Sequence, residues 1–232
     1  MPKQEESLAM PPVEIVRQYM VQNGWYDLKD PKHPFRELVD LTVVCAMGPP
    51  GGGKSIISPR FQRHFNTIVF ALVDETTMKT IFTSILGYYF REGKFLPEIA
   101  SMNEKLVQAT LNIYKRIQED LKPTPAKSHY TFNLRDVSKV ICGICLMEKK
   151  ELTNPDTAVR LWAHETSRIF GDRLINEDDR KWILDAITDC VRAPFGSDFN
   201  TLFRHLDSNH DGKVNSVDEF RGLLFGDIYT PF

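Results

Sequence analysis

Residues 43–66 decide the fold of this chain, and they read V-V-C-A-M-G-P-P-G-G-G-K-S-I-I-S-P-R-F-Q-R-H-F-N. Four of them match the pattern G-x-x-x-x-G-K-[ST], namely Gly48, Gly53, Lys54 and Ser55. In a P-loop, the backbone N–H groups of this pattern surround nucleotide phosphates, the lysine reaches the terminal phosphates and the hydroxyl binds Mg²⁺. The pattern therefore raises the hypothesis of a stand-alone P-loop NTPase.

The segments on either side of the loop decide whether it can work as a P-loop. Residues 41–47 are apolar and β-branched, which predicts the buried strand that precedes such a loop. A P-loop helix would begin at about Lys54. Pro59 would then lie in its second turn, where it removes a backbone hydrogen bond at a cost of about 3 kcal/mol. The predicted strand before the loop supports the P-loop hypothesis, whereas Pro59 after the loop argues against it.

A second apolar segment, residues 67–73, predicts a strand that ends in Asp74 and Glu75, as a Walker B strand does. Only about 20 residues separate Lys54 from this acidic pair, and a crossover between parallel strands alone takes about a dozen. The helix and further strand that normally separate the two motifs do not fit. The sequence therefore predicts two adjacent parallel strands with a short helix after Pro59, and it disfavours the stand-alone NTPase.

The same stretch resembles the G-P-P-G-G-G-R-N … R-F-x-R-H-F-N signature of axonemal dynein heavy chains, in the third AAA+ module of their motor ring. Further blocks resemble this family in the same order along the chain. They are residues 11–18 with 24–27, residues 123–136, and residues 160–165 with 170–174. In the family, the stretch lies past the Walker B strand and covers the sensor I strand and the arginine-finger segment.

The resemblance implies nucleotide-related roles for four side chains. Arg135 matches the sensor II arginine, which contacts nucleotide from the lid. Arg60 and Arg63 match arginine-finger candidates, which reach the nucleotide of a neighbouring module. Ser55 occupies the sensor I position, but the family usually has Arg-Asn where this chain has Lys54-Ser55. This departure creates the P-loop pattern and weakens the sensor I assignment.

The implied fold is α/β, the C-terminal part of a AAA+ P-loop-type large subdomain followed by an all-α lid. We expect the partial large subdomain in residues 1–125, the lid in 126–195 and an EF-hand-like linker in 196–232. Pro123 and Pro125, which follow a long amphipathic pattern, mark the first boundary. The family's Walker A and Walker B precede the first matching block, so we expect a module without its phosphate-binding half.

The C-terminal segment carries a separate pattern. Residues 207–218 match an EF-hand loop, with Asp207, Asn209, Asp211 and Asp218 as candidate cation ligands. The last loop position is Asp218 instead of the longer bidentate glutamate, and the sequence has no second EF-hand to pair with it. A calcium-responsive interaction protein therefore stays an alternative, while a cation-free linker is the favoured interpretation.

Composition excludes several other functions. The net charge of −2 gives no electrostatic basis for binding nucleic acid or an anionic membrane. No apolar run approaches the ~18 residues of a membrane span, and the N-terminus has no signal-peptide core. The pair Cys142 and Cys145 is half a zinc site at most, because no second pair lies at ligand spacing. We expect an intracellular chain that binds neither nucleic acid nor membrane.

The resemblance implies a part of the ATP-driven, microtubule-based motor of cilia and flagella. Its partners would be neighbouring AAA+ modules of a dynein ring and, indirectly, microtubules. Its place would be the cytoplasm and the axonemal cytoskeleton. The intact family module uses ATP or ADP with Mg²⁺, whereas we expect this chain alone to hold no cofactor and not to hydrolyse ATP.

Overall fold

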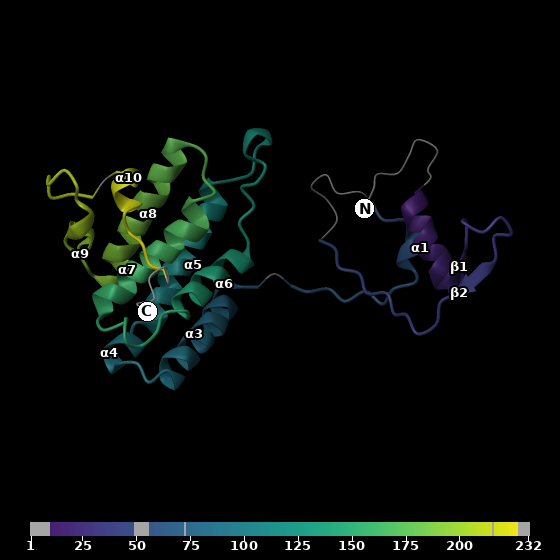
Figure 1. Cartoon of the computed structure of the whole chain (residues 1–232), viewed down its shortest axis with the longest axis horizontal. Helices are drawn as coiled ribbons and strands as arrows, with labels where there is room; N and C mark the ends of the chain where they lie inside the picture. Colours follow the sequence, from purple (N-terminus) through teal and green to yellow (C-terminus); the bar gives the residue numbers. More distant parts are fainter. Residues whose placement is uncertain (1–9, 49–55, 72, 215, 227–232) are drawn as a thin grey trace. The chain divides into compact units, whose positions relative to one another are not determined.

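The computed structural model describes residues 10–48, 56–71, 73–214 and 216–226. The chain divides into two compact units, Met1–Ala71 and Leu72–Phe232, which we call the first unit and the second unit. The labelled elements of both are drawn in Figure 1. Each unit is described below by itself.

The first unit contains helix α1 (Pro11–Gln22), strands β1 (Gly24–Tyr26) and β2 (Phe35–Glu37), and the short helix α2 (Pro59–Gln62). The sequence predicts a helix from Pro12 through Gln22 that Asn23 and Gly24 end. Helix α1 ends at Gln22 as predicted, and Asn23 caps it with a φ of 55°. The two strands pair antiparallel, with Gly24 opposite Glu37. A small apolar core joins α1 to α2 through Met10, Val13 and Phe61.

The two predicted parallel strands are wrong for this structure. Residues 41–48 and the described part of 67–73 are not strands, and the side chains of Val44 and Phe70 are each 88% exposed. A parallel strand needs neighbours on both edges for its backbone hydrogen bonds and covered faces for its apolar side chains. Within the described residues, the only sheet is the β1–β2 pair, so these segments have no such neighbours.

The short helix predicted after Pro59 is confirmed as α2. Its first residue is Pro59, and Ser58 caps it by accepting a hydrogen bond from the Arg60 backbone N–H. Residues 56–58 are not helical, so a helix that began at about Lys54 does not continue to this point. The helical geometry that a P-loop needs is therefore absent from the described residues 56–58.

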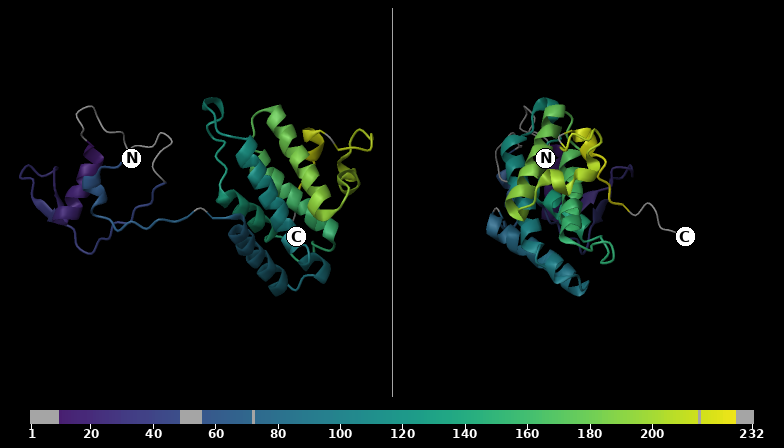
Figure 2. Two further views of the ribbon diagram at one scale, coloured as in Figure 1. Left: turned by 180° about the vertical axis from the view of Figure 1, so that it is seen from behind. Right: turned by 90° about the vertical axis from the view of Figure 1, so that its left-hand side faces the viewer.

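In the described residues of the second unit, every regular element is a helix. Its elements are α3 (Glu75–Glu92), α4 (Pro97–Ala100), α5 (Asn103–Asp120), η1 (Pro125–Lys127), α6 (Leu134–Ile144), α7 (Pro155–Thr166), the π-helical turn η2 (Ser167–Gly171), α8 (Glu177–Phe195), α9 (Phe199–Leu202), η3 (Arg204–Leu206) and α10 (Val217–Phe220). The described elements within residues 126–195 are all helical, which agrees with the all-α lid expected there, while the boundaries of that lid stay a prediction. Helix α5 packs against α3, α6, α7 and α8, as the bundle in Figures 1 and 2 shows.

Short-range signals set the ends of these helices. Asn133 caps α6 through a reciprocal capping box with Asp136, and Asn154 caps α7, which begins with Pro155. Asp74 caps α3 by accepting a hydrogen bond from the Thr77 backbone N–H at 3.2 Å. The Asp74–Glu75 pair, interpreted from sequence as the end of a Walker B-like strand, is thus a helix start.

A buried hydrogen bond ties α7 to the central helix α5. The indole N–H of Trp162 donates to Thr110 Oγ1 at 2.9 Å, and the Thr110 hydroxyl donates to the Leu106 carbonyl oxygen at 2.8 Å. Both Trp162 and Thr110 are fully buried. The hydroxyl therefore satisfies a donor that has no access to water.

Thr110→Val is expected to lower the free energy of unfolding by about 1–3 kcal/mol, because it leaves the buried indole N–H without an acceptor at nearly constant side-chain volume. Urea denaturation of the chain measures this change. Thr110→Ser, which keeps the hydroxyl, serves as the control and should cost less than Thr110→Val. A valine variant as stable as the wild type would show that the indole finds another acceptor.

Candidate functional site

The candidate sensor II residue, Arg135, lies at the start of helix α6. Its backbone N–H donates to Asn133 Oδ1 at 2.9 Å, which places the residue in the capped first turn. Its side chain is exposed, and no hydrogen bond or ion pair joins its guanidinium to another described residue. The N-terminus of a helix carries partial positive charge and unpaired N–H groups. Arg135 adds a full positive charge to an end that already favours anions.

A buried ion pair holds this helix start in place. The Asp136 side chain is only 4% exposed, accepts the Asn133 backbone N–H at 3.0 Å, and lies 2.9 Å from Arg173 Nη2. The Arg173 guanidinium also lies 5.0 Å from the ring centroid of Phe132. A second cation, Lys139, lies 3.7 Å from the Asp136 carboxylate. Asp136 therefore fixes the turn from which Arg135 projects.

A second network fastens the segment before α6 onto the start of α8. The Asp179 carboxylate accepts hydrogen bonds from Lys127 Nζ at 2.5 Å and from the Tyr130 hydroxyl at 2.8 Å. The Tyr130 oxygen in turn accepts the Ile175 backbone N–H at 3.1 Å. Burial acts to raise the pKa of Asp179, but the hydrogen bonds from Lys127 and Tyr130 outweigh it and lower the pKa below its usual value.

The lowered pKa of Asp179 gives a signed prediction for stability against pH. A carboxylate whose pKa is lower in the folded chain stabilises the fold above its unfolded pKa of about 3.9, and this contribution is lost as the pH falls below that value. Asp179→Asn is expected to lose less stability than the wild type between about pH 5 and pH 3, measured by urea denaturation. Lys127→Met, which keeps the carboxylate but removes one donor, should lie between them. Identical pH dependence in all three chains would contradict the assignment.

The arginine-finger candidates lie in the first unit. Arg60, in α2, has a mostly exposed guanidinium 3.8 Å from the Glu14 carboxylate of α1. Arg63 caps the C-terminus of α2, and its exposed side chain contacts no partner within the described residues. An exposed pair such as Arg60–Glu14 contributes little and can be exchanged for another anion. The structure places these two arginines in a different unit from Arg135.

The residues of the P-loop pattern are mostly outside the described part of the chain. Gly48 is exposed and irregular, whereas Gly53, Lys54 and Ser55 lie outside the described residues. The sensor I hypothesis for Ser55 and the phosphate-binding hypothesis for the loop therefore stay predictions.

In the EF-hand-like loop, the first acidic residue, Asp207, accepts hydrogen bonds from backbone N–H groups of the loop itself. The Asp207 carboxylate accepts the backbone N–H groups of Asp211 at 3.2 Å and Gly212 at 2.9 Å. Gly212 has a φ of 82°, which agrees with the sharp turn expected there. Among the described residues, no group of three or more His, Cys, Asp or Glu is arranged to hold a metal ion. The cation-ligand hypothesis for Asp207, Asn209, Asp211 and Asp218 stays a prediction. The flanking helices α9 and α10 have four residues each.

Two features of the site have no direct sequence signal. The Asp136–Arg173 pair joins residues far apart in the chain, although each lies in a block that resembles the dynein family. A cavity also lies between η2, α8 and α10, and its lining comes from three separate segments.

None of the described helices combines the length and apolarity that crossing a membrane requires.

Two family models match this chain in succession. Residues 1–73 match the P-loop containing dynein motor region, and residues 89–180 match the ATPase lid domain of dynein heavy chains. The second match covers α5, α6 and α7 of the helical unit, together with Arg135 and its supporting pair. The chain therefore belongs to the dynein heavy-chain family.

Similar curated proteins are axonemal members of that family. The chain is 43% identical over 231 residues to dynein axonemal heavy chain 12 of Mus musculus, a match that covers 100% of this chain and 7% of the relative. It is 42% identical to dynein axonemal heavy chain 1 and 38% identical to dynein axonemal heavy chain 3, both of Homo sapiens, and covers 5% and 6% of them. The chain thus spans a small part of the length of these relatives.

Proposed function

We propose that this chain acts as part of an ATP-driven axonemal dynein motor, in which it supplies the later part of the third AAA+ module and its lid. The observation that carries the proposal is the exposed guanidinium of Arg135 at a capped helix start, where no described residue pairs with it. Asp136 and Arg173 hold that start rigidly within a segment that matches the dynein lid. A cation presented in this way suits contact with a nucleotide phosphate.

The arginines have different proposed roles because they lie in different units of the chain. Arg135 contacts nucleotide from the lid of its own module, while Arg60 and Arg63 face the nucleotide of a neighbouring module. Positive charge supplied from a second subunit or module stabilises the charge that develops in phosphoryl transfer. The intact module would use ATP or ADP with Mg²⁺. Its partners would be adjacent modules of the ring and, indirectly, microtubules of the axoneme.

The boundaries predicted from sequence belong to this proposal. Residues 1–125 would form part of the large subdomain, residues 126–195 would form the lid, and residues 196–232 would form an EF-hand-like linker. The apolar segments around Val44 and Phe70 expose large side chains, which favours their burial by strands of a longer dynein polypeptide. That burial would supply the parallel sheet neighbours that the described residues lack.

The stand-alone NTPase is the weaker candidate. Phosphoryl transfer needs a strand, loop and helix around the phosphates and an acid that binds Mg²⁺. Here α2 begins only at Pro59, and Asp74 caps a helix instead of ending a strand. Hydrogen bonds from the side chain of Thr76 and from Thr77 lower the pKa of Asp74, which agrees with its use as a cap.

The experiment that tests this proposal measures ATP turnover by the purified chain. We expect no turnover above background, and we expect Lys54→Ala to leave that result unchanged. The matched control is Lys94→Ala, which removes a lysine outside the pattern. A turnover rate that disappears only in the Lys54 variant would replace the dynein assignment of this loop with the P-loop hypothesis.

A further inference from the structure

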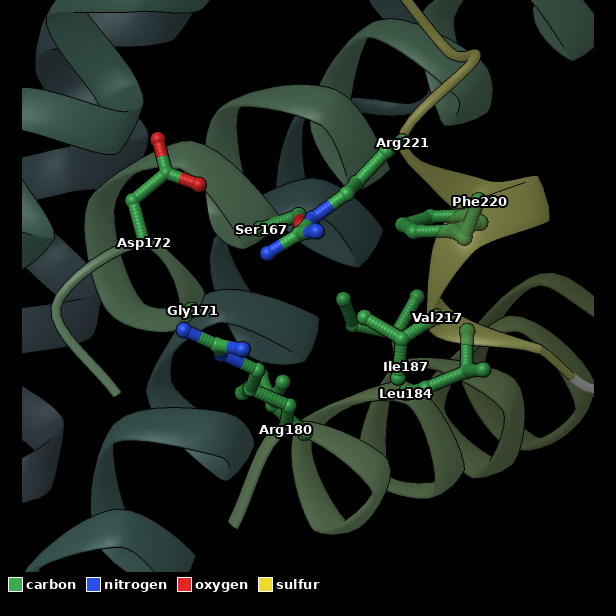
Figure 3. Close-up of a pocket in the computed structure, with 10 residues that line it drawn as sticks. Ser167, Gly171, Asp172, Arg180, Leu184, Ile187, Val217, Phe220 and Arg221 are labelled. Carbon is green, nitrogen blue, oxygen red and sulfur yellow. The ribbon is translucent and has the colours of Figure 1, made fainter. Parts of the chain in front are cut away.

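A small cavity opens in the second unit between the π-helical turn η2, helix α8 and helix α10. It encloses about 140 Å³. Figure 3 shows its apolar side chains, including Leu184 and Ile187 from α8 and Val217 and Phe220 from α10, gathered on one side. Ser167, Asp172, Arg180 and Arg221 supply its polar groups. The cavity therefore combines an apolar floor with two guanidinium groups.

The size of the cavity limits what it can hold. Pockets for cofactors and drug-sized ligands measure roughly 300–1,000 Å³. A cavity of roughly 150 Å³ accommodates a benzene-sized group. One aromatic or branched aliphatic side chain fits this volume, whereas a nucleotide does not. The occupant that matches the size is a single anchor residue of a larger molecule.

The two arginines that line the cavity can bind a carboxylate, and one of them is fixed in place. Arg180 Nε donates to the Leu174 carbonyl oxygen at 2.9 Å, which fixes the guanidinium against the backbone. Its Nη1 pairs with Glu177, and Arg221 Nη1 lies 3.3 Å from the Asp218 carboxylate. Both acidic partners are mostly exposed, so these pairs contribute little and are exchangeable. An incoming carboxylate can replace them and gain the forked geometry of arginine.

We propose that this cavity binds an acidic segment of a partner protein. The segment inserts one large apolar side chain against Leu184, Ile187, Val217 and Phe220, and its flanking carboxylates pair with Arg180 and Arg221. The Asp172 carboxylate is then an acceptor for a backbone N–H of the segment. Large buried anchors next to arginines are the residues that dominate protein interfaces.

Fluorescence anisotropy with the full chain tests this proposal. The probe is a labelled peptide with one central phenylalanine between runs of glutamate. We expect saturable binding that weakens about tenfold in Arg221→Gln, because a charge-assisted hydrogen bond is lost. Arg204→Gln makes the same charge change on an exposed arginine outside the cavity, and it should leave binding unchanged. Replacing the central phenylalanine of the peptide by alanine should also weaken binding at least tenfold.

A second variant separates geometry from charge. Arg180→Lys keeps the positive charge but removes the planar fork, and we expect it to weaken binding about fivefold. Equal binding of the phenylalanine and alanine peptides would show charge attraction alone and overturn the proposal. Equal effects of the Arg221 and Arg204 variants, or no saturation at about 1 mM peptide, would overturn it as well. A change of oligomeric state in Arg221→Gln, with no peptide binding, would assign the cavity to a second copy of the chain instead.

Discussion

Arg173→Met is expected to lower the free energy of unfolding by about 3 kcal/mol, because it leaves the buried Asp136 carboxylate without its principal cation. Breaking a buried pair by removing one partner typically costs about 3–5 kcal/mol. Lys139, 3.7 Å from the same carboxylate but largely exposed, keeps part of the compensation and places the effect at the lower end. Urea denaturation of the chain measures the change.

Two further variants show whether the cost comes from the unpaired charge. Combining Arg173→Met with Asp136→Asn removes the charge as well as its partner, so the double variant should be more stable than Arg173→Met alone. Arg204→Met removes an exposed arginine and should change stability by less than about 0.5 kcal/mol. If the double variant is the least stable of the chains, Arg173→Met loses stability because packing around Phe132 is lost. The unpaired charge of Asp136 would then not be the cause.

Arg135→Ala in an intact dynein heavy chain is expected to weaken nucleotide binding by its own module about tenfold or more. A hydrogen bond to a charged group contributes about 1.5–3 kcal/mol, and a phosphate contact by Arg135 is of this kind. Folding should be unaffected, since the Arg135 side chain makes no ion pair or hydrogen bond with any other described residue. Titration with a fluorescent nucleotide measures the affinity.

The matched control for Arg135 is Lys139→Ala on the same helix. Lys139 is also exposed, but it pairs with Asp136, so its removal should leave nucleotide affinity nearly unchanged. Lys54→Ala should likewise have little effect if the loop is not a P-loop. An unchanged affinity in Arg135→Ala, with normal affinity in the wild type, would remove Arg135 from the nucleotide site.

The helix ends were predictable because their signals act over a few residues. The residue type of Asn133 and Asn154 predicts helix caps, and they cap α6 and α7. Pro59 begins the short helix expected after it. The long amphipathic pattern before Pro123 forms α5, Asn103–Asp120. The sequence after Asn133 predicts a helix through about Lys150, but α6 ends earlier, at Ile144.

The candidate site was predictable only in part. The position of Arg135 followed from a resemblance to the dynein family, and the matches to the motor region and the lid agree with that family. The support of Arg135 by Asp136 and Arg173 could not be predicted from the sequence, because the packing of α6 beside η2 brings these two residues together. The residues around the cavity share no motif, since η2, α8 and α10 contribute them separately.

The sequence by itself determined the helices of the lid segment, their asparagine caps at Asn133 and Asn154, and the family to which the chain belongs. These depend on local hydrogen bonds, on the fixed φ of proline and on ordered blocks of residues. Only the tertiary structure decided that residues 41–48 are not a strand and that Asp74 begins a helix. An apolar, β-branched segment becomes a buried strand only when other strands satisfy its backbone, and the described residues supply none beside it.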